Sequence, residues 1–132
     1  MDEERVRLVA AKYSRYGPKT DQAVKTALAG GVKEHKFKPS QRAILTVVGS
    51  QGDEFIDPAR PYCSCGHFFF RVLGGKDQTC YHLLSYKIAT ELGLVDVTAF
   101  DDAEYGQVFA TLVGDVFGVV ERSSGRTSVV LD

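Results

Sequence analysis

The sequence predicts an α+β fold with helices at the N-terminus, a β-hairpin, a cysteine-containing knuckle, two further helices and a final hairpin. Two observations indicate this class. Apolar residues recur at helical spacing before residue 30 and after residue 80, whereas residues 42 to 48 are rich in β-branched residues. A chain of 132 residues fits one domain. Because no linker, repeat or low-complexity tract interrupts it, we expect a single domain over residues 1–132.

Two amphipathic helices are expected first. Apolar side chains at helical spacing predict a helix from about residue 3 to 16 that ends before Gly17-Pro18; they are Val6, Val9, Ala10 and Tyr13. A second helix is expected from Thr20 or Asp21, either of which can cap it, to a stop at Gly30-Gly31.

Extended structure follows. Residues 32–38 alternate loosely between apolar and polar side chains, and residues 42–48 favour a strand. Residues 49–53 are typical of a turn, which leads to a short strand at 54–57. A hairpin is therefore expected just before the cysteines.

Two segments follow the expected hairpin. Residues 66–73 favour a short helix with Phe68, Phe69, Val72 and Leu73 on its apolar side, although their alternation also permits a strand. The spacing of Leu84, Ile88 and Leu92 predicts a longer helix from Cys80 to Gly93 that packs on the hairpin.

The end of the chain also shows helix and hairpin signals. Asp101 and Glu104 form a capping-box pattern that opens another helix to about Gly114. Residues 116–132 suggest a hairpin that turns at Ser123-Ser124-Gly125. This hairpin would either cover a sheet edge or pair with another chain, which would allow a homodimer.

All three cysteines fit one metal site. Cys63 and Cys65 can project to the same side of an extended segment, and Cys80 and His82 can do so if Cys80 lies at a helix entry and His82 in its first turn. The resulting Cys3His set is typical of a structural zinc ion, because four protein ligands leave no position for water or substrate.

This ligand set has two alternatives. Ordinary buried cysteines are the first. His67 is the second possible histidine ligand, but it would crowd three ligands onto one short segment, so His82 is preferred. A disulfide between Cys63 and Cys65 would close a small strained ring, and the acidic N-terminus lacks the apolar stretch of a secretory signal. We therefore expect a reducing compartment.

The cysteine and histidine spacing has a known counterpart. Cys63-Ser64-Cys65 and Cys80-Tyr81-His82 match the C-x-C and C-x-H pattern of SWIM zinc fingers, and the chain resembles this family over residues 36–115. The hairpin and helix around them would form a SWIM-type ββα finger at about residues 42–93. The segment from Tyr62 to Leu84 resembles the small stand-alone SWIM subunits of recombination (Shu) complexes.

This resemblance implies a non-enzymatic function. Such subunits are partners of a recombinase paralogue, an ATPase, and support homologous recombination and DNA repair on single-stranded DNA. Apolar side chains near the zinc either form the protein–protein surface or belong to the core; they are Tyr62, Phe69, Leu83 and Tyr86. The chain lacks a phosphate-binding loop of its own and a local catalytic signature, so we expect no enzyme activity.

Charge suggests a second mode of binding. Residues 5–42 hold ten basic and two acidic side chains, although the whole chain has a net charge of -1. Such a segment either contacts phosphates or forms solvated helix faces. The candidate residues for nucleic-acid binding are Arg5, Lys12, Arg15, Lys33, Lys36, Lys38 and Arg42. Tyr13 or Tyr16 could stack on bases.

The zinc-finger pattern also fits a different function. SWIM fingers occur in regulatory and transposase-related proteins, so a stand-alone nucleic-acid reader is the alternative function. No apolar run in the sequence approaches the roughly 20 residues of a membrane span, so no membrane association is expected. The expected location is cytoplasmic in an archaeon or nuclear in a eukaryote.

Overall fold

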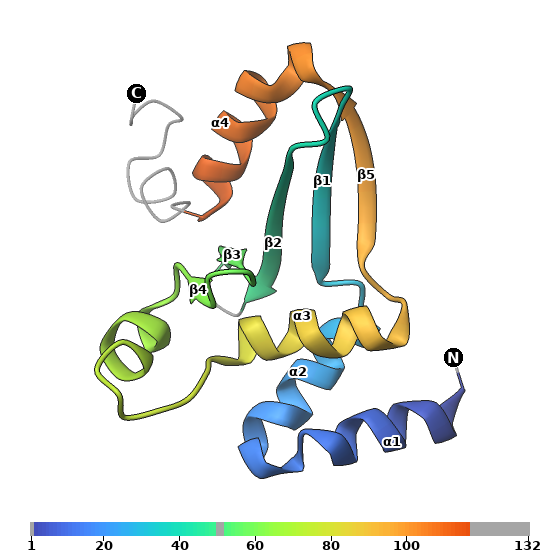
Figure 1. The fold of residues 1–132 in the computed structure, drawn as a ribbon, viewed down its shortest axis with the longest axis vertical. Helices are drawn as coiled ribbons and strands as arrows, with labels where there is room; N and C mark the ends of the chain where they lie inside the picture. Colours follow the sequence, from blue (N-terminus) through green and yellow to red (C-terminus); the bar gives the residue numbers. More distant parts are fainter. Residues whose placement is uncertain (1, 50–51, 117–132) are drawn as a thin grey trace.

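The computed structural model describes residues 2–49 and 52–116 (Figure 1). Helices at the N-terminus precede a five-stranded mixed sheet, whose strands lie in the order β4-β3-β2-β1-β5. The strands are β1 (Val32–Lys38), β2 (Ala43–Gly49), β3 (Gly52–Asp57), β4 (Tyr62–Cys63) and β5 (Asp96–Asp101). The predicted α+β class is confirmed, whereas the predicted hairpin over 116–132 lies almost wholly outside the described residues.

Two helices and a 3-10 turn form the N-terminal part. Helix α1 (Glu3–Lys12) is capped by Asp2, whose carboxylate accepts a hydrogen bond from the Glu4 N–H at 3.0 Å. The predicted helix to residue 16 is interrupted at Tyr13, and Ser14–Tyr16 form the 3-10 turn η1.

Helix α2 (Pro18–Leu28) begins earlier than expected. The prediction that Thr20 or Asp21 caps it is wrong. Proline suits the first position of a helix because its missing N–H would have no partner there. Gly17 precedes it with φ 67°, a left-handed conformation that suits glycine.

The predicted hairpin is present. Strands β2 and β3 pair antiparallel with Val47 opposite Glu54, and β4 extends the sheet with Cys63 opposite Ile56. Strand β1 pairs antiparallel with β2 on one side. On its other side β1 pairs in parallel with β5, a strand that the sequence analysis did not predict.

The later helices follow the predicted order. The helix expected over 66–73 is a short π-helix, η2 (Phe68–Val72). The longer helix α3 (Tyr81–Leu92) has Cys80 as its N-cap and ends at Gly93 in the left-handed region. Asp101 and Glu104 form the predicted capping box at the 3-10 turn η3 (Asp102–Glu104), which leads into α4 (Tyr105–Val116).

The apolar side predicted for residues 66–73 is partly wrong. Phe68 is buried and Val72 packs against the core, but Phe69 and Leu73 are exposed. Phe68 and Val72 lie four positions apart on the side of the segment that faces the interior, and Phe69 and Leu73, each one position later, lie outside it.

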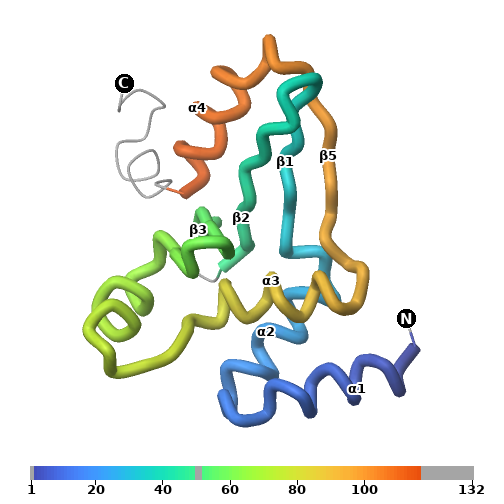
Figure 2. Tube along the Cα trace, in the orientation of Figure 1, coloured from blue at the N-terminus to red at the C-terminus, as the bar shows by residue number. Residues whose placement is uncertain are grey.

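The two faces of the sheet carry different helices. Val32 and Phe37 point to opposite faces of β1 because they differ by an odd number of positions. Val32 joins the core beneath α2 and α3, whereas the Phe37 ring contacts Tyr105 of α4 at a centroid distance of 4.8 Å. Figure 2 shows α3 crossing one end of the sheet beside α2. In the same view, α4 and β1 lie on opposite sides of β2.

The main core forms where α3 meets α2 and the sheet. Leu84 and Ile88 of α3 are fully buried together with Ala27 of α2 and Val47 of β2. The predicted packing of the α3 apolar stripe is thus confirmed. Among the described residues, no helix combines the length and apolar character needed to cross a membrane.

Candidate metal centre

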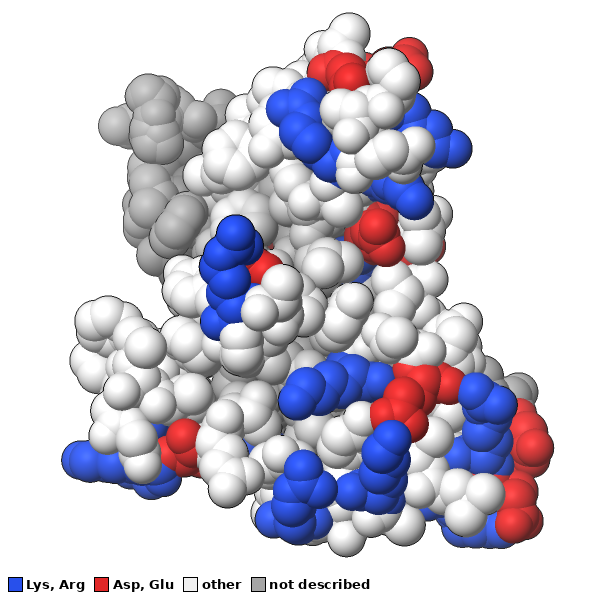
Figure 3. All heavy atoms as spheres, in the orientation of Figure 1, with Lys and Arg blue, Asp and Glu red and all other residues white. Residues whose placement is uncertain are grey.

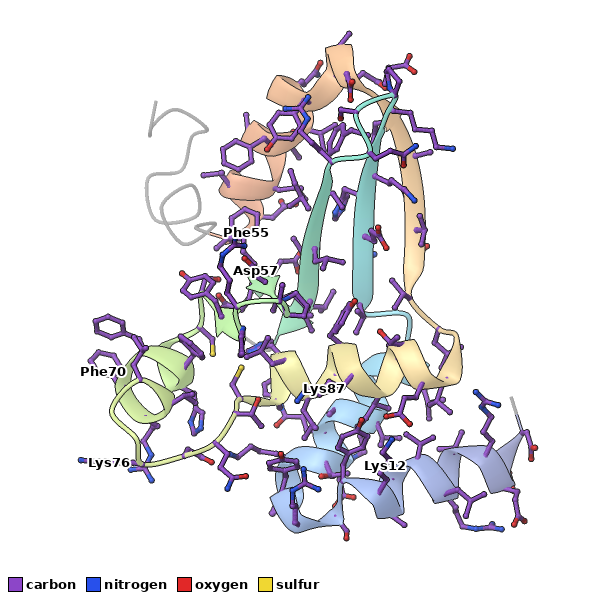
Figure 4. The ribbon with its side chains drawn as sticks, viewed as in Figure 1. Lys12, Phe55, Asp57, Phe70, Lys76 and Lys87 are labelled. Atoms are coloured by element: carbon purple, nitrogen blue, oxygen red, sulfur yellow. The ribbon has the colours of Figure 1, made fainter. Side chains whose placement is uncertain are left out.

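Four buried side chains meet where β4 faces the start of α3. The Sγ atoms of Cys63, Cys65 and Cys80 and a ring nitrogen of His82 all lie within 4.8 Å of one another. Figure 4 shows sulfur atoms between the strand segment and the first turn of α3. Four donor atoms this close together can surround a single ion.

Local structure explains how each pair forms. Cys63 ends the short strand β4, and Cys65 follows two residues later in a bend, where its carbonyl accepts a hydrogen bond from the Phe69 N–H at 3.2 Å. Cys80 has an extended backbone conformation as the N-cap of α3, so its side chain and that of His82 can converge. The expected placement of Cys80 at the helix entry and His82 in the first turn is confirmed.

The hydrogen bonding of the four side chains indicates that they suit a metal ion. Nδ1 of His82 is buried and has no hydrogen-bond partner among the described residues. A buried nitrogen without a partner carries a desolvation cost that a metal ion would offset. The cluster is therefore a buried Cys3His group suited to one zinc ion.

The electrostatics of the group also suit a cation. Hydrogen bonds from Cys63 and Cys80 lower the pKa of Cys65, whereas hydrogen bonding to Cys65 and Cys80 raises the pKa of Cys63. Burial opposes the charged imidazole, yet the adjacent sulfur atoms of Cys65 and Cys80 outweigh it and raise the pKa of His82 to about 9. The side chains thus share protons around a thiolate, which is the charge that zinc requires.

Neighbouring groups hold the knuckle in position. The Phe68 N–H donates to Cys65 Sγ at 3.3 Å. The Ser64 hydroxyl accepts from the Phe55 N–H at 2.9 Å and donates to Glu54 at 2.7 Å, which ties the knuckle to β3. The sequence analysis missed Ser64, although its place between two cysteines is a signal that could have found it.

Gly49 is a second residue that the sequence analysis missed as part of the site. A Cβ atom added to it would lie 2.7 Å from Nε2 of His82, so the imidazole lies directly against this backbone. No local pattern marks this contact, because it joins β2 to α3 across the fold.

His67 lies outside the cysteine cluster. Its Nε2 is 2.9 Å from the Asp77 carboxylate, which also accepts from Lys19 Nζ at 2.5 Å. The hydrogen bond from Lys19 is the main reason that the pKa of Asp77 falls to about 2. The structure therefore brings His82, and not His67, to the three cysteines.

The seven basic residues predicted to bind nucleic acid fall into two groups. Arg5, Lys12 and Arg15 belong to the α1 region, which lies at the opposite end of the molecule from the β1–β2 turn (Figure 1). Lys33, Lys36, Lys38 and Arg42 belong to β1 and that turn. Figure 3 likewise shows blue side chains gathered in separate areas. They do not form one site.

The α1 group is largely engaged within the chain. Arg5 donates to the Glu91 backbone carbonyl at 2.5 Å, and Lys12 pairs with the Glu91 carboxylate at 3.0 Å. Arg15 lies over the Tyr16 ring at 4.5 Å. Tyr13 is buried and donates a hydrogen bond to Glu91, so it is not available to stack on a base.

The fold brings together a buried Cys3His group suited to one zinc ion, at C-x-C and C-x-H spacing in the sequence. Over 76 residues the chain is 36% identical to "Zinc finger SWIM domain-containing protein 7 homolog" of Dictyostelium discoideum. This confirms the resemblance to SWIM zinc-finger proteins.

The extent of that similarity is limited. The matched region covers 56% of this chain and 49% of the relative, so the chain spans about half the length of the curated protein that it matches. No family model matches the sequence. No solved structure matches it either.

Proposed function

We propose that this chain is a non-enzymatic zinc-finger accessory protein of homologous recombination and DNA repair, which acts as the partner of a recombinase-paralogue ATPase. The observation that carries the proposal is the buried Cys3His group at SWIM spacing. The similarity to a SWIM domain-containing protein supports it, as does the resemblance to the SWIM subunits of recombination complexes.

We assign Cys63, Cys65, Cys80 and His82 as ligands of one structural zinc ion. When bound, the ion would supply a crosslink and no reactive group, because four protein ligands close its coordination. The two ligand pairs come from β4 and from the start of α3. Since α3 also packs on α2, this crosslink supports the position of the N-terminal helices against the sheet.

The exposure of the side chains around the proposed zinc site indicates which of the predicted residues can contact an ATPase. Tyr62 and Phe69 are exposed, in keeping with a place at an interface. Leu83 is buried and Tyr86 packs against the core, so these two support the fold. The proposed protein contact therefore centres on the knuckle and η2.

We assign single-stranded DNA binding to the basic residues of β1 and the β1–β2 turn. Lys36 and Lys38 lie two positions apart on β1 and thus on one face of the sheet. Neither forms an ion pair within residues 2–49 and 52–116, whereas Arg42 lies over the Tyr105 ring at 4.0 Å. Lysines without carboxylate partners are available to phosphates, which makes this end of the sheet the proposed DNA contact.

The first test combines metal and partner binding. Zinc content is measured on the purified chain, and an ATPase of the recombinase-paralogue type is tested for co-purification with and without a chelator. One zinc per chain and chelator-sensitive association would support the adaptor function. The adaptor function would be refuted if the purified chain held no zinc, or if the ATPase co-purified equally well with and without the chelator.

The second test concerns DNA. Lys36→Glu/Lys38→Glu should abolish binding to an oligo(dT) strand, and the salt dependence of any residual binding should fall by roughly 1.4 in log–log slope for two lost phosphate contacts. Lys25→Glu/Lys87→Glu, which makes the same charge change on exposed helix positions, is the matched control. A larger loss in the control would place the DNA over the helices instead.

A further inference from the structure

Three large apolar side chains are exposed on the short helix between the two ligand pairs. Phe69, Phe70 and Leu73 are 62%, 73% and 64% exposed. We call these three residues the knob. Figure 4 shows the segment extending away from the body of the molecule, with Phe70 at its outer side.

The knob is held on an ordered base. The Leu73 N–H donates to the Phe68 carbonyl at 2.9 Å, five residues back, as in a π-helix. This winding directs Phe68 inward, where its ring contacts Tyr62 edge-on at 5.4 Å. Since the Phe68 N–H also donates to Cys65, the base of the knob adjoins the metal centre directly.

Basic side chains border the knob. Arg71 and Lys76 are exposed, and neither forms an ion pair in the part of the chain that the structure describes. The neighbouring carboxylate of Asp77 is already engaged by Lys19 and His67. Figure 3 shows blue side chains at the outer end of this segment next to a white surface.

We propose that the knob is a docking site for a protein whose apolar pocket is bordered by carboxylates. A convex group of aromatic and aliphatic side chains fits a pocket, and buried aromatic anchors supply most of the energy of such interfaces. Acidic side chains at the edge of the partner's pocket would pair with Arg71 and Lys76. Such charge complementarity sets the orientation of the two proteins and their association rate.

Other occupants suit the knob less well. Membrane association by electrostatics needs a cluster of several basic residues, and two flank the knob. The Phe69 and Phe70 rings meet at 87° with centroids 5.0 Å apart, so they do not form a parallel platform for successive bases. The protein pocket is therefore the occupant that the geometry favours.

A peptide selection tests this inference. A phage-displayed random peptide library is selected on the zinc-loaded chain after depletion on Phe69→Ser/Phe70→Ser/Leu73→Ser. Recovered peptides should combine Asp or Glu with aromatic or aliphatic residues. Their affinity should fall about tenfold or more on the triple variant, and several-fold on Arg71→Glu/Lys76→Glu at low salt.

Matched controls change equally exposed positions elsewhere. Leu8→Ser on α1, where the side chain is 63% exposed, and Lys25→Glu/Lys87→Glu should leave binding unchanged. Zinc content and circular dichroism are measured for each variant. If the triple variant loses zinc, Phe69→Ser and Phe70→Ser are used singly.

Several results would overturn the inference. These are a library without knob-dependent peptides, peptides without an acidic excess, and knob-dependent self-association in sedimentation. Knob-dependent binding to phosphatidylserine vesicles or oligo(dT) would also overturn it. The inference rests on the proposed function, because it refines the protein contact proposed for the knuckle and η2. The selection uses no ATPase, so its failure would remove the knob from that contact, whereas the co-purification experiment tests the zinc-dependent association separately.

Discussion

The imidazole of His82 lies against the backbone of Gly49, so that a Cβ atom built on Gly49 would be 2.7 Å from Nε2 and 2.9 Å from the Gly52 carbonyl oxygen. Such distances are well inside van der Waals contact, and the second obstacle is backbone. The β2–β3 hairpin and the ligand histidine thus share a space that admits no side chain at residue 49.

Gly49→Ala should therefore weaken both the fold and the metal site. We expect a loss of roughly 1–3 kcal/mol in the free energy of unfolding, as for other overpacked interiors. Zinc should also transfer faster to a competing chelator because the imidazole must move. Gly106→Ala is the matched control, since its Cβ would meet nothing within 4 Å. Equal stability of the two variants would contradict this prediction.

The two histidines near the cysteines should differ in their effect on zinc. His82→Ala removes a donor from the cluster and should destabilise the fold by on the order of 3 kcal/mol, with loss of zinc to a moderate chelator. His67→Ala should retain one zinc per chain. Metal analysis after chelator challenge measures both, and zinc loss in His67→Ala alone would reverse the ligand assignment.

The raised pKa of Tyr13 predicts that the protein loses stability at alkaline pH. Burial, together with its hydrogen bond to Glu91, raises the pKa of Tyr13 to about 12. The folded state thus holds this proton after the unfolded state has lost it near pH 10. The stabilisation is complete below pH 10 and disappears as the pH rises through about 12.

Urea unfolding at several values between pH 9 and 12 measures this effect. The wild type should lose on the order of 1 kcal/mol more than Tyr13→Phe across that range. The variant serves as the control for lysine ionisation, which affects both proteins alike. Parallel stability curves would show that the Tyr13 proton does not contribute.

The ion pair of Asp77 should stabilise the loop between the ligand pairs. Lys19 on α2 is the main cause of the low pKa of Asp77, so the contribution is present above pH 3.8 and is lost as the pH falls through about 2. At neutral pH we expect Asp77→Asn to cost on the order of 1 kcal/mol, because both side chains are partly buried. Asp96→Asn on exposed β5 is the control, and an equal cost in both variants would contradict the prediction.

Much of the fold could be predicted because local signals agreed with tertiary contacts. The Leu84, Ile88 and Leu92 stripe and the Asp101–Glu104 capping box both act within a few residues, and both are present. Strand β5 could not be predicted in the same way. Most of its side chains are exposed, so it lacks the alternation of a half-buried strand, and its parallel pairing with β1 depends on residues far away in the sequence.

The cysteine and histidine cluster was predictable for a chemical reason, since few residue types make such a donor set and their spacing restricts the geometry. The nucleic-acid residues were grouped by sequence alone, and the structure divides them between the α1 region on one side and β1 with the β1–β2 turn on the other. The presence of a basic residue in the sequence does not tell where its side chain lies in the fold or which carboxylate it meets. Lys12 and Lys36 therefore appear equivalent in the sequence, although Glu91 engages the former.

The parallel pairing of β1 with β5 encloses the whole finger, because Lys33 and Asp96 are neighbours in the sheet and lie on either side of it in the chain. Closing so long a loop has an entropic cost, which slows folding of long-range strand pairs. A zinc ion that joins Cys63 and Cys65 to Cys80 and His82 would shorten the effective loop before the strands meet. The metal would then hasten folding of the sheet as well as stabilise the finished fold.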